Sequence, residues 1–274
     1  MKSGHLMFNR QVPDSSRWDI PAVTHLQRLR SAELERIRDL LPPRSRILEL
    51  GGGNGHQAAV LSTWGHYVSS VDIAPPLSGH TMFFPVLLYD GKNLPYDDEA
   101  FDVVFSSNVL EHVTHLSVIL KEIARVTKSD GVVVHILPSS AWRFWTSLTH
   151  YVHLAKRVGR RFFRPDAGSD RSSSEVTSSK RNWGGLLKRV FLDGPHGAYP
   201  NEFYELYAFS RSRWLHVFAT HGFEVTSCFK NGLFYTGYEI FPRMSMSGRR
   251  NLSRFLGSAT WIYIMRPGLK RPLS

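Results

Sequence analysis

Along residues 44–139, short apolar runs typical of strands alternate with segments whose apolar residues have helical spacing. Apolar runs bounded by glycine or polar residues predict five strands, at residues 46–51, 66–73, 86–90, 100–106 and 131–137. Helical spacing of apolar residues predicts helices between them, at residues 56–64 and 116–126. Strands that alternate with helices predict an α/β protein with a parallel, doubly wound sheet.

The flanking regions depart from this alternation. Residues 21–41 predict a helix that ends before Pro42 and Pro43, because proline disfavours a helical residue in front of it. After the fifth strand the alternation stops for about seventy residues, then resumes with a helix at 212–221 and strands at 223–229 and 261–265. We therefore expect an N-terminal arm and helix (1–43), followed by one domain (44–274) in which residues 140–210 form an insertion.

Composition places the chain among globular proteins, with 42% hydrophobic, 12% aromatic and 21% charged residues. No uninterrupted apolar run reaches the length of about 18 residues that a membrane-spanning helix needs, and residues 1–16 lack the apolar core of a secretory signal. The single cysteine, Cys228, cannot form an internal disulfide. These features predict a cytoplasmic protein, and we expect no bound metal ion.

A glycine-rich loop follows the first strand. Glu49 is followed by Gly51, Gly53 and Gly55, in the pattern E-x-G-x-G-x-G. Glycines permit positive φ angles and allow a ligand to approach the backbone. The dinucleotide fingerprint G-x-G-x-x-G requires Gly or Ala at position 56, where this chain has His56, so the loop argues against a nicotinamide-dependent oxidoreductase.

Two aspartates follow the next two predicted strands. Asp72 ends the second strand, where a carboxylate can accept hydrogen bonds from a ribose diol. Asp90 precedes Gly91 at the end of the third strand and could hold an adenine amino group. The alternatives are a turn-forming Asp72 and an ordinary loop aspartate at position 90.

Five segments in this order resemble the small class I S-adenosylmethionine-dependent methyltransferases: ELGGGNG from Glu49, VDIAP from Val71, YDGKNLPY from Tyr89, FDVVFSSNVLEHV from Phe101 and GVVVHILPS from Gly131. The resemblance covers residues 44–139. It implies a doubly wound Rossmann-like methyltransferase sheet with helices on both faces and an insertion after the fifth strand. It also implies methyl transfer with S-adenosylmethionine as cofactor.

The resemblance assigns cofactor-binding roles to particular positions. Glu49 would lie near the amino-acid end of the cofactor, and Asn108 under its methionine part. The implied cofactor-binding residues are Glu49, Gly51, Gly53, Gly55, Asp72, Ile73, Asp90, Gly91 and Asn108. Gly52 and Asn54 are a small departure, which makes the loop more flexible than the family pattern.

Methyl transfer needs a general base only if the acceptor keeps a proton until it attacks. His112, after the fourth strand, and His196, in the insertion, are candidate bases, and Tyr199 and Glu202 are candidate acceptor-binding residues. Two alternatives stay open. His112 instead starts the next helix, and the aromatic residues of the insertion form a lid that packs on the core.

Charge is unevenly distributed in a chain of net charge +11. Residues 44–139 carry 6 basic and 10 acidic residues, whereas residues 156–190 carry 10 basic and 3 acidic ones. Before that basic run, Trp142, Trp145, Leu148 and Val152 have helical spacing, which is typical of a helix lying on an anionic membrane. A lid helix over the substrate is the alternative.

These patterns narrow the partners without naming one. No nucleic-acid-binding module is visible, so an RNA acceptor is disfavoured. We expect a small-molecule or lipid/glycan-linked acceptor and, through the basic insertion, a peripheral location at the inner membrane surface. A non-catalytic methyltransferase-like binding or scaffold protein is the alternative, and the oligomeric state stays open.

Overall fold

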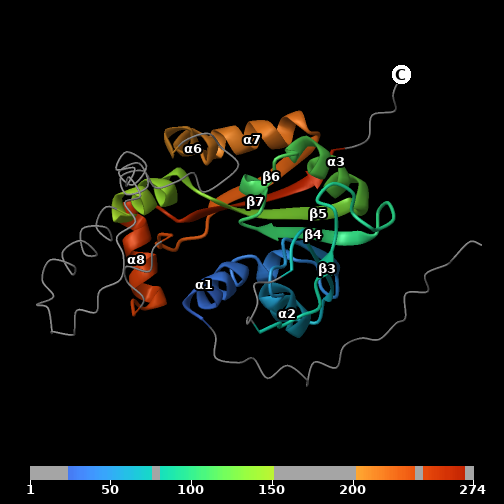
Figure 1. The fold of residues 1–274 in the computed structure, drawn as a ribbon, viewed down its shortest axis with the longest axis horizontal. Helices are drawn as coiled ribbons and strands as arrows, with labels where there is room; N and C mark the ends of the chain where they lie inside the picture. Colours follow the sequence, from blue (N-terminus) through green and yellow to red (C-terminus); the bar gives the residue numbers. More distant parts are fainter. Residues whose placement is uncertain (1–23, 76–80, 151–201, 238–242, 269–274) are drawn as a thin grey trace, which may run out of the picture.

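The computed structural model describes residues 24–75, 81–150, 202–237 and 243–268, and these form one sheet with helices around it (Figure 1). Seven strands lie in the order β3-β2-β1-β4-β5-β7-β6. Their bounds are β1 Arg46–Leu50, β2 Tyr67–Asp72, β3 Leu87–Leu88, β4 Phe101–Ser107, β5 Thr127–Pro138, β6 Phe223–Lys230 and β7 Thr260–Pro267.

The strands from β1 to β5 pair in parallel, as the alternation of strands and helices predicts. The parallel pairing predicted from this alternation does not extend to β7, which runs antiparallel to both β5 and β6 and sets Tyr263 opposite His135. The helix α8 (Met246–Leu256), which connects β6 to β7, lies beyond the strand ends instead of over a face (Figure 1). Because α8 does not carry the chain across a face of the sheet, the chain enters the sheet again in the opposite direction, and β7 runs antiparallel to β6.

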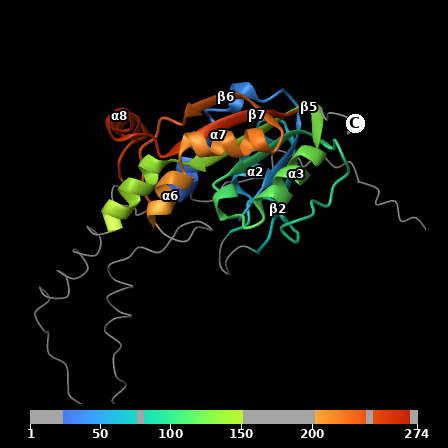
Figure 2. The ribbon, with the colours of Figure 1, turned by 90° about the horizontal axis from the view of Figure 1, so that it is seen from above.

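Helices cover both faces of the sheet (Figures 1 and 2). The helices α3 (Leu116–Val126) and α7 (Arg211–Thr220) pack on one face, where Leu120 and Trp214 join a core cluster with Leu48. The opposite face is covered by α1 (His25–Leu34) and α2 (His56–Thr63), through Leu34 and Leu61 against Ile47. The doubly wound fold is thus confirmed.

Some predicted boundaries are wrong at the edges of the fold. The helix expected at 21–41 is α1 alone, because the chain turns after Leu34 and continues in the short 3₁₀ helix η2 (Arg38–Leu40). Ile37 is nevertheless buried in the core, which explains the continuous apolar pattern. The third strand shortens to Leu87–Leu88, an exposed edge strand, and α6 (Glu202–Ala208) and α8 have no predicted counterpart.

The described ends of the insertion pack on the core. Residues 140–150 are helical, and Arg143 in this helix forms a fully buried ion pair with Glu205 of α6, with Nε 2.7 Å from Oε2. Trp142 is 7% exposed and packs against Phe209. The expectation that Trp142 belongs to a membrane-facing stripe is therefore wrong, because its indole fills the core; Val152 lies outside the described residues.

Within the described ranges, no helix has the length and apolar character needed to cross a bilayer.

Candidate functional site

The glycine loop connects β1 to α2 in a conformation that suits glycine. Gly51, Gly53 and Gly55 have φ angles of +72°, +54° and +78°. The N–H groups of Gly51 and Gly52 donate to the carbonyl oxygen of Val71 at 2.8 and 3.1 Å, which fixes the loop beside the end of β2. Ligands of open α/β sheets bind at this edge, outside the carboxyl ends of the strands.

The glycines have different surroundings. A Cβ at Gly51 would overlap the side chain of Val109, and a Cβ at Gly52 would overlap Ser70 and lie 3.0 Å from Glu49 Oε2. Gly52 is therefore required by close packing, although it departs from the family pattern. A Cβ at Gly53 would meet no atom within 4 Å. Gly53 is thus the loop position where backbone faces open space.

Glu49 lies almost fully buried at the base of the loop, where it is 2% exposed and accepts a hydrogen bond from Ser70 Oγ at 2.5 Å. Burial raises the pKa of Glu49 to about 8. The carboxyl is therefore protonated at neutral pH in the protein alone, and a nearby cation would favour its ionised form. Ser70 belongs to this site, and the sequence pattern does not single it out.

Asp72 lies next to the open backbone. Its Oδ2 accepts from the Gly53 N–H at 2.8 Å, and its Oδ1 accepts from the Ile73 N–H at 2.7 Å. Ile73 is 68% exposed at the rim. The structure therefore brings the predicted ribose-binding residues and the glycine loop together, while ribose binding itself stays a prediction.

Asp90 organises its own turn. The side chain is exposed, and it accepts hydrogen bonds from the Lys92 N–H at 2.8 Å, the Asn93 N–H at 2.7 Å and Asn93 Nδ2 at 2.7 Å. These contacts, that of the Asn93 N–H foremost, lower the pKa of Asp90. A Cβ at Gly91 would lie 3.1 Å from Ile73 Cγ2, so this turn abuts the Asp72 segment. Adenine binding by Asp90 stays a prediction.

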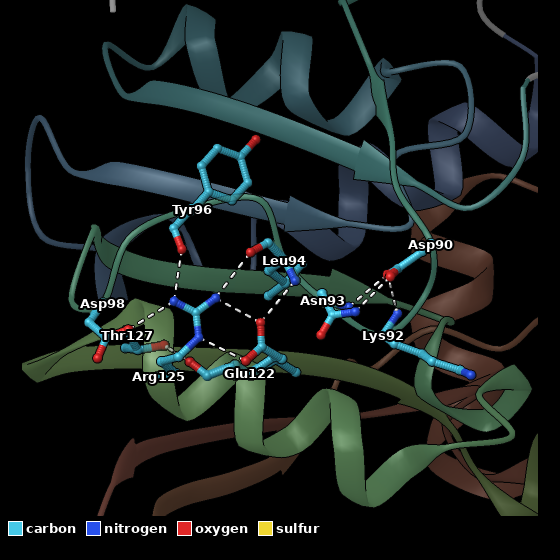
Figure 3. Close-up of polar contacts among 10 residues, drawn as sticks. Asp90, Lys92, Asn93, Leu94, Tyr96, Asp98, Glu122, Arg125 and Thr127 are labelled. Carbon is cyan, nitrogen blue, oxygen red and sulfur yellow. Dashed lines mark hydrogen bonds and ion pairs between the residues drawn. The ribbon is translucent and has the colours of Figure 1, made fainter. Parts of the chain in front are cut away.

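Arg125 of α3 holds the segment that follows Asp90 (Figure 3). Its guanidinium donates to both carboxylate oxygens of Glu122, each at 2.7 Å, and to the carbonyl oxygens of Leu94 (3.0 Å) and Tyr96 (2.8 Å). Asp98 Oδ1 lies 2.9 Å from Arg125 Nη1. The Arg125 contact lowers the pKa of Glu122. A side chain on a helix thus positions the predicted adenine-side loop.

Asn108 and His112 lie at the carboxyl end of β4. Asn108 has a φ of +56°, a conformation that asparagine tolerates, and with its side-chain amide oriented so that Oδ1 faces α1, Oδ1 accepts from Arg30 Nη1 at 2.6 Å. His112 ends the 3₁₀ helix η3 (Leu110–His112), and its Nε2 is 3.8 Å from Oε1 of the buried Glu111. Burial lowers the pKa of His112, which favours a neutral imidazole. Its role as a base stays a prediction.

The predicted acceptor-binding residues fall mostly outside the described chain. His196 and Tyr199 lie in the range 151–201, and Glu202 is the first residue of α6. Their proposed roles stay predictions. The structure adds three polar residues that the sequence pattern does not reveal: Arg30 and Glu33 on α1, and Tyr235 after β6, all joined by hydrogen bonds.

The arrangement fits S-adenosylmethionine. Gly53 offers an open backbone position, Asp72 places a carboxylate beside it, and the buried Glu49 lies behind the loop. Metal-ligating geometry is not found among the His, Cys, Asp and Glu residues of the described ranges.

Residues 23–228 match the family model described as the methyltransferase domain, and the chain belongs to this family. The predicted class I S-adenosylmethionine-dependent methyltransferase family, with its cofactor, is therefore confirmed. The fold also resembles a chain in the complex between the Haloferax volcanii Trm112 methyltransferase activator and the putative methyltransferase, with a TM-score of 0.50, 14% identity, and 89% of this chain and 92% of that chain covered.

Two curated relatives match part of the chain. The biotin biosynthesis bifunctional protein BioHC of Cellvibrio japonicus is 32% identical over 152 residues, which are 51% of this chain and 30% of that protein. The demethylmenaquinone methyltransferase of Corynebacterium urealyticum is 33% identical over 93 residues, 33% of this chain and 40% of that protein. The chain thus spans less than half the length of either relative.

Proposed function

We propose that this chain transfers a methyl group from S-adenosylmethionine to a small-molecule or lipid/glycan-linked acceptor. The observation that carries the proposal is the open backbone at Gly53 beside Asp72, in a chain of the methyltransferase domain family. The bound cofactor would supply an electrophilic methyl group on a sulfonium. The protein then has to hold the acceptor in line with it and exclude water.

The end of β4 is where the chain's own residues would act on the acceptor. His112, whose burial favours the neutral imidazole, can accept a proton from an acceptor hydroxyl at neutral pH. Glu111 lies beside it, and burial raises the pKa of its carboxyl to about 8. A protonated Glu111 carries no negative charge that would favour the imidazolium form of His112.

A surface formed by the first helix of the insertion and by α8 favours a lipid-linked acceptor. This surface, called the Phe255 surface, consists of Phe144, Leu148, Arg250, Arg254 and Phe255. Phe144, Leu148 and Phe255 are 51%, 45% and 85% exposed, respectively, and both arginines are exposed.

The two halves of the Phe255 surface are continuous. Phe144 packs edge-to-face on Trp145, with ring centroids 5.2 Å apart, and Trp145 Nε1 donates to the Leu256 carbonyl oxygen at 2.8 Å. Residues 243–274 contain seven basic residues and no acidic one. Exposed aromatic and aliphatic side chains beside arginines suit an anionic bilayer, so we place the protein at the inner membrane surface.

Labelled S-adenosylmethionine tests the acceptor. The protein and an Asp72→Ala variant would be incubated with a lipid extract, a water-soluble extract and purified RNA, each with a methyl-labelled cofactor. We expect label in a lipid or small-molecule product with the wild-type protein only. Label in RNA would contradict the proposed acceptor class, and cofactor binding without labelling of any extract would favour a scaffold protein.

Liposome flotation tests the membrane contact. Phe255→Ser should reduce flotation with anionic vesicles, whereas Val118→Ser, at an exposed apolar position on α3, should not. Wild-type protein that stays at the bottom of the gradient with anionic vesicles would contradict the membrane proposal and leave methyl transfer unaffected.

A further inference from the structure

Arg30 projects from α1 to the carboxyl end of β4. Its Nη1 lies 2.7 Å from Glu33 Oε2 and 3.1 Å from the Tyr235 hydroxyl, and with the Asn108 amide oriented so that its oxygen faces α1, Nη1 donates to Asn108 Oδ1 at 2.6 Å. The Arg30 side chain is 19% exposed. A guanidinium in this position is held by three different parts of the chain.

Glu33 holds the Arg30 guanidinium in place. Its carboxylate is fully buried, and Oε1 accepts from Asn231 Nδ2 at 2.8 Å, the Tyr235 hydroxyl at 2.6 Å and Thr260 Oγ1 at 3.0 Å. These contacts leave Oε2 to Arg30. Because the partner of Arg30 is itself fixed, the guanidinium is preorganised and its orientation loses little entropy when it binds a ligand.

The helix α1, which carries Arg30, also contacts the start of α2, directly after the glycine loop. The next residue, Ser31, has its Oγ 3.0 Å from Nε2 of His56, the first residue of α2. On the other side, Val109 follows Asn108 and abuts Gly51. The helix α1 therefore packs against the start of α2, next to the glycine loop, and against the end of β4, where the family resemblance places Asn108 under the methionine part of the cofactor.

The guanidinium keeps donors for a further acceptor. Arginine has five N–H donors in a planar fork. The close contacts to described residues all involve Nη1, while Nη2 makes a 3.3 Å contact with Asn108. Glu33 contacts the Arg30 guanidinium through Oε2 only, so it does not pair with two parallel N–H donors of the guanidinium at once. A carboxylate is the group that matches two parallel guanidinium donors.

We propose that Arg30 binds the carboxylate of the methionine part of S-adenosylmethionine, which makes α1 a wall of the cofactor site. This inference rests on the proposed function in taking S-adenosylmethionine as the ligand. It assigns a cofactor role to a residue outside the segments 49–55, 71–75, 89–96 and 101–113.

Two ligands that differ in the methionine part give the test. S-adenosylhomocysteine contains the amino-acid carboxylate, and 5′-methylthioadenosine lacks it. By calorimetric titration, Arg30→Gln should weaken S-adenosylhomocysteine binding by roughly 10- to 100-fold, the value of a charge-assisted contact. Binding of 5′-methylthioadenosine should change less than about twofold, since that ligand makes no use of the guanidinium. Arg28→Gln, at an exposed position on the same helix, is the control and should leave both affinities unchanged.

Arg30→Lys guards against a folding defect, because it keeps the positive charge beside Glu33 but not the fork. We expect it to lose part of the S-adenosylhomocysteine affinity. Equal losses for both ligands, or no loss for either, would overturn the Arg30 proposal while leaving the proposed function intact. A wild-type protein that binds neither ligand would overturn both.

Discussion

Gly55 is in backbone contact with Phe84. A Cβ at Gly55 would lie 2.5 Å from the Phe84 carbonyl oxygen and 2.7 Å from its nitrogen, whereas a Cβ at Gly53 would meet nothing within 4 Å. Both residues have positive φ. Two glycines of one loop therefore have separable roles, one in packing and one facing open space.

Alanine substitutions should separate these roles. Gly53→Ala should cost about 1 kcal/mol for its left-handed backbone, yet abolish most cofactor binding because the new Cβ occupies the open position. Gly55→Ala adds a backbone clash, so we expect a loss of several kcal/mol, about 3 or more, and a reduced yield of folded protein. Thermal unfolding and calorimetric titration with S-adenosylhomocysteine would measure both.

The opposite ranking of stabilities would argue against this division of roles. Gly65→Ala is a matched control, since Gly65 also has a positive φ, of +88°, and an unobstructed Cβ position, but lies after α2, away from the loop. Gly65→Ala should lower the free energy of unfolding by about as much as Gly53→Ala does, because both residues have a positive φ, and it should leave cofactor affinity unchanged.

Asp72 should contribute to cofactor affinity through its carboxylate. Asp72→Asn keeps an oxygen for the Gly53 N–H contact, but it removes the charge that would accept from a ribose diol and the acceptor of the Ile73 N–H. We expect a loss of about 1.5–3 kcal/mol in binding, or roughly 10- to 100-fold in Kd. Asp97→Asn, at an exposed position in the loop after β3, is a suitable control, and an equal effect of both variants would refute the ribose role of Asp72.

The sequence predicts the central sheet well because the relevant forces are local. The stripe of apolar residues in α3 is bounded by Leu116 and Val126 in both pattern and structure. Strands β1, β2 and β4 are short apolar runs beside glycine or polar residues, and their ends place Glu49, Asp72 and Asn108 at one edge. The family resemblance is therefore enough to locate the edge of the sheet that is predicted to bind the cofactor.

Contacts between distant segments are harder to predict. Arg30 and Tyr235 are 205 positions apart, and their hydrogen bond depends on β7 returning antiparallel between β5 and β6. The apolar runs of the sequence do not predict that reversal, and α8 has only the short helical spacing of Leu252, Phe255 and Leu256. The inward face of Trp142 is similarly set by packing against Phe209, and the apolar pattern fits a membrane-facing helix as readily.

Arg125 should support cofactor binding from a distance. Arg125→Ala removes hydrogen bonds to the Leu94 and Tyr96 carbonyl oxygens and the cationic partner of Glu122, which keeps only its contact with the Leu94 N–H among the hydrogen bonds described. We expect a stability loss of about 1–3 kcal/mol, moderated by partial exposure, and a severalfold weaker affinity for 5′-methylthioadenosine. Lys121→Ala, on the same helix, should change neither quantity; unchanged affinity in Arg125→Ala would show that the loop after β3 does not depend on this anchor.

The pKa values of two buried carboxyls predict how stability depends on pH. Burial raises the pKa of Glu49 and of Glu111 to about 8, from 4.5 in the unfolded chain; for Glu111, Arg30 opposes this rise and Glu33 adds to it. Between these values the folded protein binds more protons than the unfolded chain, so stability falls as pH rises. Each carboxyl contributes a slope of up to about 1.4 kcal/mol per pH unit.

The window from about pH 7.5 to about pH 8.5 separates this effect from the titration of histidine. Burial lowers the pKa of His56, His66, His112 and His135, and in the unfolded chain their pKa is about 6.5, so about one pH unit above that value these residues are mostly neutral in both states. The melting temperature should therefore fall from about pH 7.5 to about pH 8.5. Glu111→Gln should reduce this fall by about half, since one of two titrating carboxyls is removed, and should be more stable than the wild type at pH 8. A wild-type melting temperature that rises across this window would contradict protonated Glu49 and Glu111.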